Sequence, residues 1–223
     1  MKSVVIIGAG AHGREVAEIL RQPTRDQVVI IGFIDDNPNL HDQRINDLPV
    51  VGDWKWFEGV DRNEVAVICA SGFSRTRKQM ADKATSLGLK FANALSPEAY
   101  ISPYSKVGEG VVMYARSMAC NGALIANHVA INVGAVVSHD TRVDAYSTLN
   151  PGVNLAGNVI ISEGCLLGIG CNVIQGISIG AWSVVGAGAT VIRDLPDNVT
   201  AVGVPAKIIE TRKNEPTIPS EPN

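Results

Sequence analysis

The sequence is poor in features that mark several common classes of protein. Aromatic residues make up only 5% of the 223 residues, and the 19 Lys and Arg residues form no run. With a formal net charge of −3, this distribution argues against a surface for nucleic acid or anionic membrane. No apolar stretch approaches the length of a membrane span, and the first residues lack a signal-peptide cleavage pattern. We therefore expect a cytoplasmic protein without a nucleic-acid partner and without membrane insertion.

The first 95 residues alternate between strand-like and helix-like segments. Apolar runs at 4–7, 28–34 and 65–70 are typical of buried strands, whereas residues 14–21 and 74–87 have helical spacing. Such alternation predicts a parallel sheet with helical crossovers. Because the region is short for a full dinucleotide-binding fold, we expect a Rossmann-like domain of about four strands.

From Ile101 onward a strict six-residue period replaces this pattern. Each hexad begins with an apolar residue, and glycine recurs three places later, where a tight corner needs a positive φ angle. The period is the signature of a parallel β-helix, in which three hexads form one triangular coil. A β-sandwich would need the spacing to be a coincidence at all sixteen positions: Ile101, Val107, Met113, Ala119, Ile125, Ile131, Val137, Val143, Leu149, Leu155, Ile161, Leu167, Val173, Ile179, Val185 and Val191.

The chain therefore divides into three segments. We predict an α/β Rossmann-like domain at 1–95 and a β-helix of five coils at 96–211. Three prolines among polar residues predict a disordered tail at 212–223.

A glycine-rich turn follows the first strand. The motif Gly8-x-Gly10-x-x-Gly13 stands between a strand and a helix, where it permits close approach of the backbone to a phosphate group. The acidic pair Asp35 and Asp36 follows the second strand, at the place of a ribose-binding carboxylate. Since the remainder of a dinucleotide domain is missing, a mononucleotide fits better. The alternative for the acidic pair is a plain turn over residues 35–38.

One histidine in the periodic region has the surroundings of a general base. His139 occupies an outward-facing place in its hexad, and Asp140 follows it. A histidine can accept the proton of an acyl acceptor, and a neighbouring carboxylate can hold its tautomer and support its charge. The alternative is a surface His–Asp pair without a catalytic role, and the motif alone does not decide between them.

The coil length brings further residues beside this pair. Eighteen residues after His139 lies Gly157, whose backbone N–H could approach a developing oxyanion closely. By the same step, Ile169 and Ala187 stack on each other along a different edge.

The whole pattern, from Val4 to Lys207, resembles a family of sugar acyltransferases. They are typified by bacterial UDP-4-amino-sugar N-acetyltransferases and the sialic acid O-acetyltransferase group, which join a small nucleotide-binding domain to a left-handed β-helix. The resemblance implies a homotrimer that binds acetyl-CoA between neighbouring helices. It also implies His139 as the base, Asp140 as its supporting acid and Asn132 beside the acceptor, although Asn132 could instead bond to Asn150 within the coil stack.

The resemblance further implies binding roles for other positions. Contacts to acetyl-CoA would come from Gly157, Ile169, Ala187 and Lys207. In the N-terminal domain, Asp35 and Asp36 would bind the base or ribose of a nucleotide sugar, and His12 would lie near the sugar-phosphate end. Gly8, Gly10 and Gly13 belong to the same site, which Gly72 and Arg77 would close. One departure from the family is Thr148, which stands where a second histidine often contacts CoA.

The function we expect is N-acetylation of a nucleotide-linked 4-amino-4,6-dideoxy sugar in cell-surface polysaccharide biosynthesis. O-acetylation of a sialic acid or another sugar hydroxyl would use the same residues and stays open. A non-catalytic nucleotide-sugar-binding scaffold is the third alternative. A carbonic-anhydrase-like zinc site needs three convergent histidines, and only His128 and His139 fall in the coils, so we expect no metal.

Overall fold

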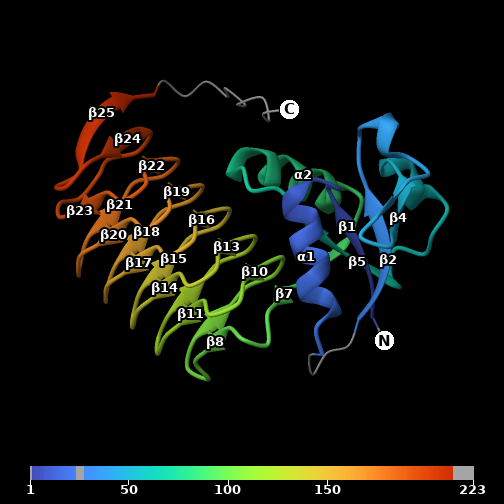
Figure 1. Ribbon diagram of the computed structural model, residues 1–223, viewed down its shortest axis with the longest axis horizontal. Helices are drawn as coiled ribbons and strands as arrows, with labels where there is room; N and C mark the ends of the chain where they lie inside the picture. The colour runs from blue at the N-terminus through green and yellow to red at the C-terminus, as the bar shows by residue number, and fades with distance from the viewer. Residues whose placement is uncertain (1, 24–27, 213–223) are drawn as a thin grey trace.

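The computed structural model describes residues 2–23 and 28–212, which form an α/β domain and a long β-helix (Figure 1). The predicted disordered tail lies outside the described residues except for Arg212. Within the described part of the chain, no helix is long and apolar enough to cross a membrane.

The N-terminal sheet has the strand order β3-β4-β2-β1-β5-β6. All neighbours pair in parallel except β3 with β4, which are antiparallel. The prediction of four strands was too low, because β3 and β6 have only two residues each and show no apolar run. The strands are β1 (Lys2–Ile7), β2 (Val28–Ile34), β3 (Arg44–Ile45), β4 (Leu48–Gly52), β5 (Val65–Cys69) and β6 (Lys90–Phe91).

Two α-helices cover the two faces of this sheet, α1 (Ala11–Arg21) and α2 (Ser74–Ser86). Alternate residues of β1 point to opposite sides, so Val4 and Ile6 pack in the cluster that contains α1. Val5 and Ile7 pack in the cluster that contains α2. Two short 3₁₀ helices, η1 (Pro38–Leu40) and η2 (Trp54–Glu58), follow β2 and β4.

The β-helix has three faces, each a parallel sheet apart from one final hairpin strand. The first face consists of β7 (Ala94–Leu95), β10 (Val112–Met113), β13 (Ala130–Ile131), β16 (Thr148–Leu149), β19 (Leu166–Leu167), β22 (Val184–Val185), β24 (Val199–Val202) and β25 (Lys207–Thr211). The second consists of β8 (Tyr100–Ile101), β11 (Met118–Ala119), β14 (Val136–Val137), β17 (Asn154–Leu155), β20 (Asn172–Val173) and β23 (Thr190–Val191). The third consists of β9 (Lys106–Val107), β12 (Leu124–Ile125), β15 (Arg142–Val143), β18 (Ile160–Ile161) and β21 (Ser178–Ile179).

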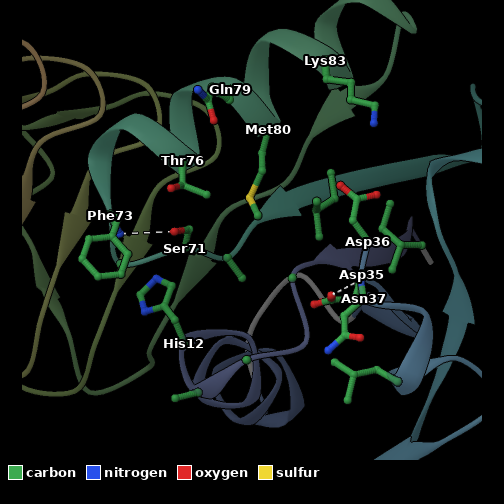
Figure 2. Close-up of a pocket in the computed structure, with 18 of the residues that line it drawn as sticks. His12, Asp35, Asp36, Asn37, Ser71, Phe73, Thr76, Gln79, Met80 and Lys83 are labelled. Atoms are coloured by element: carbon green, nitrogen blue, oxygen red, sulfur yellow. Dashed lines mark hydrogen bonds between the residues drawn. The ribbon is translucent and has the colours of Figure 1, made fainter. Parts of the chain in front are cut away.

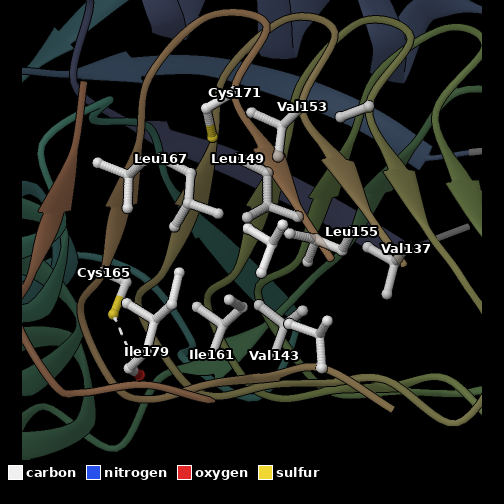
Figure 3. Packing of buried hydrophobic residues seen from close by; sticks show 14 of the residues in the cluster. Val137, Val143, Leu149, Val153, Leu155, Ile161, Cys165, Leu167, Cys171 and Ile179 are labelled. Carbon is white, nitrogen blue, oxygen red and sulfur yellow. Dashed lines mark hydrogen bonds between the residues drawn. The ribbon is translucent and has the colours of Figure 1, made fainter. Parts of the chain in front are cut away.

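The predicted register of the coils is confirmed. Val137 pairs with Leu155 and Val143 with Ile161, each eighteen residues further along the chain. The apolar side chains stack inside the coils as a continuous core (Figure 3). The coils begin earlier than Ile101, because β7 already pairs with β10.

The N-terminal domain packs on the first face of the β-helix. Ala94, Val112 and Tyr114 of the coils belong to the same buried cluster as Val16 of α1. Helix α1 therefore lies against the first coil, and the two parts share part of one apolar core (Figure 1).

Candidate functional site

His139 and Asp140 lie at the corner between the second and third faces, in the turn from β14 to β15. Both side chains are exposed, by 56% and 61%, and His139 Nδ1 is 3.0 Å from Asp140 Oδ2. A carboxylate only accepts hydrogen bonds, so this contact places the imidazole proton on Nδ1. In the neutral ring this tautomer leaves the lone pair on Nε2, the atom that would accept the proton in general-base catalysis.

Gly157 lies directly against the imidazole, one coil further on. A Cβ at this position would be 2.4 Å from His139 Nε2, so any side chain would displace the ring. The N–H of Gly157 donates to no backbone carbonyl within the described ranges. An accessible lone pair and a free backbone donor therefore meet at this corner, as acyl transfer needs.

Gly122 is a residue of this site that the sequence motifs did not predict. It lies one coil before Asp140 and has a φ of 73°. A Cβ there would be 2.4 Å from Asp140 Oδ1. The eighteen-residue register was the signal that could have revealed it.

The predicted acetyl-CoA residues Ile169 and Ala187 lie at another corner, between the first and second faces, where both are exposed. They stack as predicted, and Gly188 N donates to Ile169 O at 2.8 Å. Asn132 lies at the same corner. Its Oδ1 accepts from Val133 N at 2.9 Å, whereas the Asn150 amide donates to a backbone carbonyl, so the alternative of an Asn132–Asn150 bond is wrong.

Lys207 is exposed at the start of β25. It lies on the edge strand of the first face, at the end of the coil stack farthest from the N-terminal domain (Figure 1).

A cavity of about 710 Å³ opens at the carboxyl ends of β1, β2 and β5. Figure 2 shows α2 on one side of it, with the turn after β2 and the start of α1 facing it. Six of the eight predicted substrate residues line the cavity, namely Gly8, Gly10, His12, Asp35, Asp36 and Gly72. Side chains that the sequence did not single out add to the wall, among them Trp54, Phe73, Met80 and Lys83.

The glycine motif and the acidic pair have distinct structural roles at this cavity. Gly13 is buried behind it, where a Cβ would be 2.1 Å from Gly8 O, so its prediction as a contact residue is corrected to close helix–strand packing. Asp35 accepts hydrogen bonds from Ala9 N at 2.8 Å and Asn37 N at 2.9 Å, which shape the turns on both sides. Asp36 is exposed and accepts only a longer bond, 3.3 Å, from Trp54 Nε1.

His12 is joined to the β-helix. Its Nδ1 is 2.8 Å from the hydroxyl of Tyr114, which donates to Glu15 Oε2 at 3.0 Å. Burial, helped by the positive charge of Arg77, lowers the pKa of His12 to about 4, so the ring is neutral at physiological pH. Tyr114 carries no motif, and only the docking of the two parts brings it here.

Arg77 does not line the cavity, contrary to the prediction. Its side chain is fully buried between α2 and the β-helix, and it bonds to the Thr148 hydroxyl at 2.9 Å. Thr148 is itself buried, so it faces the N-terminal domain rather than an open groove.

Comparison with known proteins gives the family. Residues 3–84 match the N-terminal domain of PglD. A solved structure of a GDP-perosamine N-acetyltransferase variant from Caulobacter crescentus, in complex with CoA and GDP-perosamine, has a TM-score of 0.85 and 38% identity, covering 94% of this chain and 98% of that one. This chain belongs to the hexapeptide-repeat sugar acetyltransferases.

Two further relatives also match along most of their length. The acetyltransferase domain of PglB from Neisseria gonorrhoeae is 31% identical with a TM-score of 0.85, covering 94% of this chain and all of that chain, 100%. GDP-perosamine N-acetyltransferase from Escherichia coli is 24% identical over 91% of this chain and 94% of that protein. A putative acetyltransferase from Schizosaccharomyces pombe is 35% identical, but the chain spans only 44% of its length.

Membership of this family also gives the hand of the coils, which are left-handed. Within residues 2–23 and 28–212, no three His, Cys, Asp or Glu side chains gather as metal ligands.

Proposed function

We propose that this protein transfers the acetyl group of acetyl-CoA to the amine of a nucleotide-linked 4-amino-4,6-dideoxy sugar. The observation that carries the proposal is the His139–Asp140 pair packed against the free N–H of Gly157. The cavity with its phosphate-binding turn supports a nucleotide-linked acceptor. The Caulobacter crescentus relative, solved with CoA and GDP-perosamine, supports both substrates.

In the proposed reaction, the acceptor amine attacks the thioester carbonyl while Nε2 of His139 takes the amine proton. Asp140 supports the resulting imidazolium, and the Gly157 N–H stabilises the oxyanion of the tetrahedral intermediate. Collapse of the intermediate breaks the C–S bond, and the imidazolium returns the proton to the CoA thiolate. The acetylated amine and free CoA are then the products, without a metal ion.

Neutral His12, Asp36 and the turn from Gly8 to Gly10 are the proposed contacts to the nucleotide sugar. Asp35 would act by holding that turn through its bond to Ala9 N. We further propose that the reaction takes place in the cytoplasm, where it would modify a precursor of a cell-surface polysaccharide.

We propose that the protein is a homotrimer, and the positions of the proposed residues support sites shared between copies. The cavity belongs to the domain that covers the first face, whereas His139 lies at the corner between the other two faces. In a triangular coil that corner is opposite the first face. Ile169 and Ala187 lie on yet another corner, which is consistent with an acetyl-CoA held between two copies, with His139 from one copy and the Ile169–Ala187 edge from the other.

The acceptor assay tests the proposed activity. Purified protein with acetyl-CoA would be offered GDP-, UDP- and dTDP-linked 4-amino-4,6-dideoxy sugars, with free sialic acid as the hydroxyl acceptor. We expect thiol release with an amino sugar and an N-acetylated product by mass spectrometry. Turnover of the hydroxyl acceptor alone would instead establish the O-acetyltransferase alternative, and no turnover at all would favour the scaffold.

A further inference from the structure

Arg77 is a cation buried without a neutralising charge among its bonded partners. All three nitrogens of its guanidinium donate hydrogen bonds, and the side chain is fully buried in the seam between the two parts of the chain. The acceptors are all neutral oxygens: His128 O (2.8 Å), Ser71 O (2.6 Å), Tyr146 O (2.7 Å), Ser147 O (3.2 Å) and Thr148 Oγ1 (2.9 Å).

Burial lowers the pKa of Arg77 to about 10, which still leaves the side chain charged at neutral pH. A buried charge is costly, and well-packed apolar residues often stabilise such a seam at least as well. Stability alone therefore explains poorly why an arginine with a complete set of partners stands here.

The same bonds extend to the wall of the cavity. Ser71, Gly72 and Phe73 line it in the turn between β5 and α2 (Figure 2). Arg77 holds the carbonyl of Ser71, and the Thr148 hydroxyl donates to the carbonyl of Gly72 at 3.3 Å. Ser71 Oγ in turn accepts from Phe73 N at 3.2 Å. The peptide groups of this wall are thus tied to the first face of the β-helix.

We propose that Arg77 and Thr148 are positioning residues for the nucleotide pocket, because they hold the 71–73 turn in the shape that binds a nucleoside diphosphate. The proposal rests on the proposed function in one respect, namely that the cavity takes a nucleotide. It goes beyond that function by making nucleotide affinity depend on a β-helix residue that does not line the cavity.

The test uses a matched pair of variants in the full chain. Thr148→Val keeps the shape of the buried side chain but removes the hydroxyl that bonds to Arg77 and Gly72, whereas Thr148→Ser keeps that hydroxyl. Titration calorimetry with GDP, UDP and dTDP measures binding without any need for acetyl transfer. For the diphosphate that the wild type binds, we expect Thr148→Val to raise Kd about fivefold to tenfold and Thr148→Ser to stay within about twofold, as for loss of one charge-assisted hydrogen bond.

Arg77→Lys adds a second measurement, since it keeps the positive charge but lacks the planar guanidinium that donates to several acceptors at once. We expect it to weaken nucleotide binding at least as much as Thr148→Val, while the KM for acetyl-CoA stays unchanged. A lower Tm for Thr148→Val with wild-type Kd for the nucleotide would mean that the seam is only structural, and would overturn the proposal.

The outcomes also separate this proposal from the proposed function. A wild type that binds a nucleoside diphosphate but transfers no acetyl group refutes the activity and leaves the positioning role to be judged by Kd. A wild type that binds none of GDP, UDP and dTDP refutes both.

Discussion

The exposure of His139 is unusual for a residue held so firmly. Asp140 fixes Nδ1, and the bare backbone of Gly157 supports the ring from the next coil, so the imidazole is oriented without being buried. An open ring can meet two large substrates, but it needs them to exclude water when they bind.

Replacing His139 by Ala should remove the proton acceptor and leave the coil intact, because the side chain is outside the core. We expect kcat to fall by about 10²- to 10⁴-fold, the usual contribution of a general base. Stopped or continuous thiol-release assays measure kcat, and CoA binding with circular dichroism reports folding. Asn121→Ala, at the same exposed place one coil earlier, is the matched control and should keep near-wild-type activity. A His139→Ala enzyme with wild-type kcat would show that His139 is not the general base.

Gly122 offers a subtler test, because it touches no substrate. An alanine there would push the Asp140 carboxylate away from its present position, and its positive φ adds strain. We expect kcat for Gly122→Ala to fall by up to about a hundredfold, as small displacements near a catalytic group can cause. Gly134→Ala, a corner glycine with similar φ and open space around its Cβ, controls for backbone strain. Equal loss in both variants would contradict a role through Asp140.

The sequence predicted the residues at the turns better than those at the docked seam. The eighteen-residue step correctly placed Gly157 over His139, since coil stacking is periodic. Arg77 was predicted at the wrong place, because helical spacing shows which face of α2 a residue lies on but not which part of the protein packs against that face. Tyr114 and Thr148 were missed as partners of the cavity for the same reason, since their roles arise only when the two parts pack together.

Among the structural elements, the corner that ends in His128 connects the β-helix to the sheet domain. The ring of His128 stacks on Tyr146, with centroids 5.2 Å apart, and meets Phe91 edge-on at 4.4 Å. Its carbonyl accepts a hydrogen bond from Arg77, so both the side chain and the backbone of His128 make contacts between the two parts of the chain. Burial, together with the charge of Arg77, lowers the pKa of His128 to about 4.

A depressed histidine pKa makes this seam sensitive to acid. Between pH 6.5 and about pH 4, His128 is protonated in the unfolded chain but stays neutral in the folded one. The contribution of His128 to the free energy of unfolding is therefore fully present above this range and is lost as the pH falls through it. We expect the Tm of the wild type to drop between pH 7 and pH 4.5. The drop should be smaller by about 5 °C in His128→Asn, whose side chain tolerates the positive φ. Scanning calorimetry at both pH values measures these Tm values. An equal drop in Tm for the wild type and His128→Asn would contradict the role given to His128.

For the whole molecule, the separation of the pocket from the His139 corner predicts complementation between inactive subunits. Gly10→Asp puts a negative charge where a phosphate would bind, yet aspartate caps a helix well and its Cβ meets nothing within 4 Å. Co-expressing Gly10→Asp with His139→Ala should restore about a quarter of wild-type activity, since one site in four of a random trimer receives both intact parts.

Each of these variants alone should be inactive, which provides the control. If the mixed protein is no more active than either parent, a pocket and a base shared between copies would be ruled out. Mass photometry or sedimentation of the same samples would report the trimer directly.

The eighteen-residue coil has a consequence for how such a molecule can change in length. Removing one hexad between His139 and Gly157 would turn everything beyond it by a third of a revolution and carry Gly157 away from the His139 edge. Removing a whole coil beyond Gly157 would shorten the prism but leave each remaining residue on its own edge. Changes in the number of hexads are therefore compatible with the proposed chemistry only in whole coils. The β-helix can lengthen or shorten only in steps of one coil.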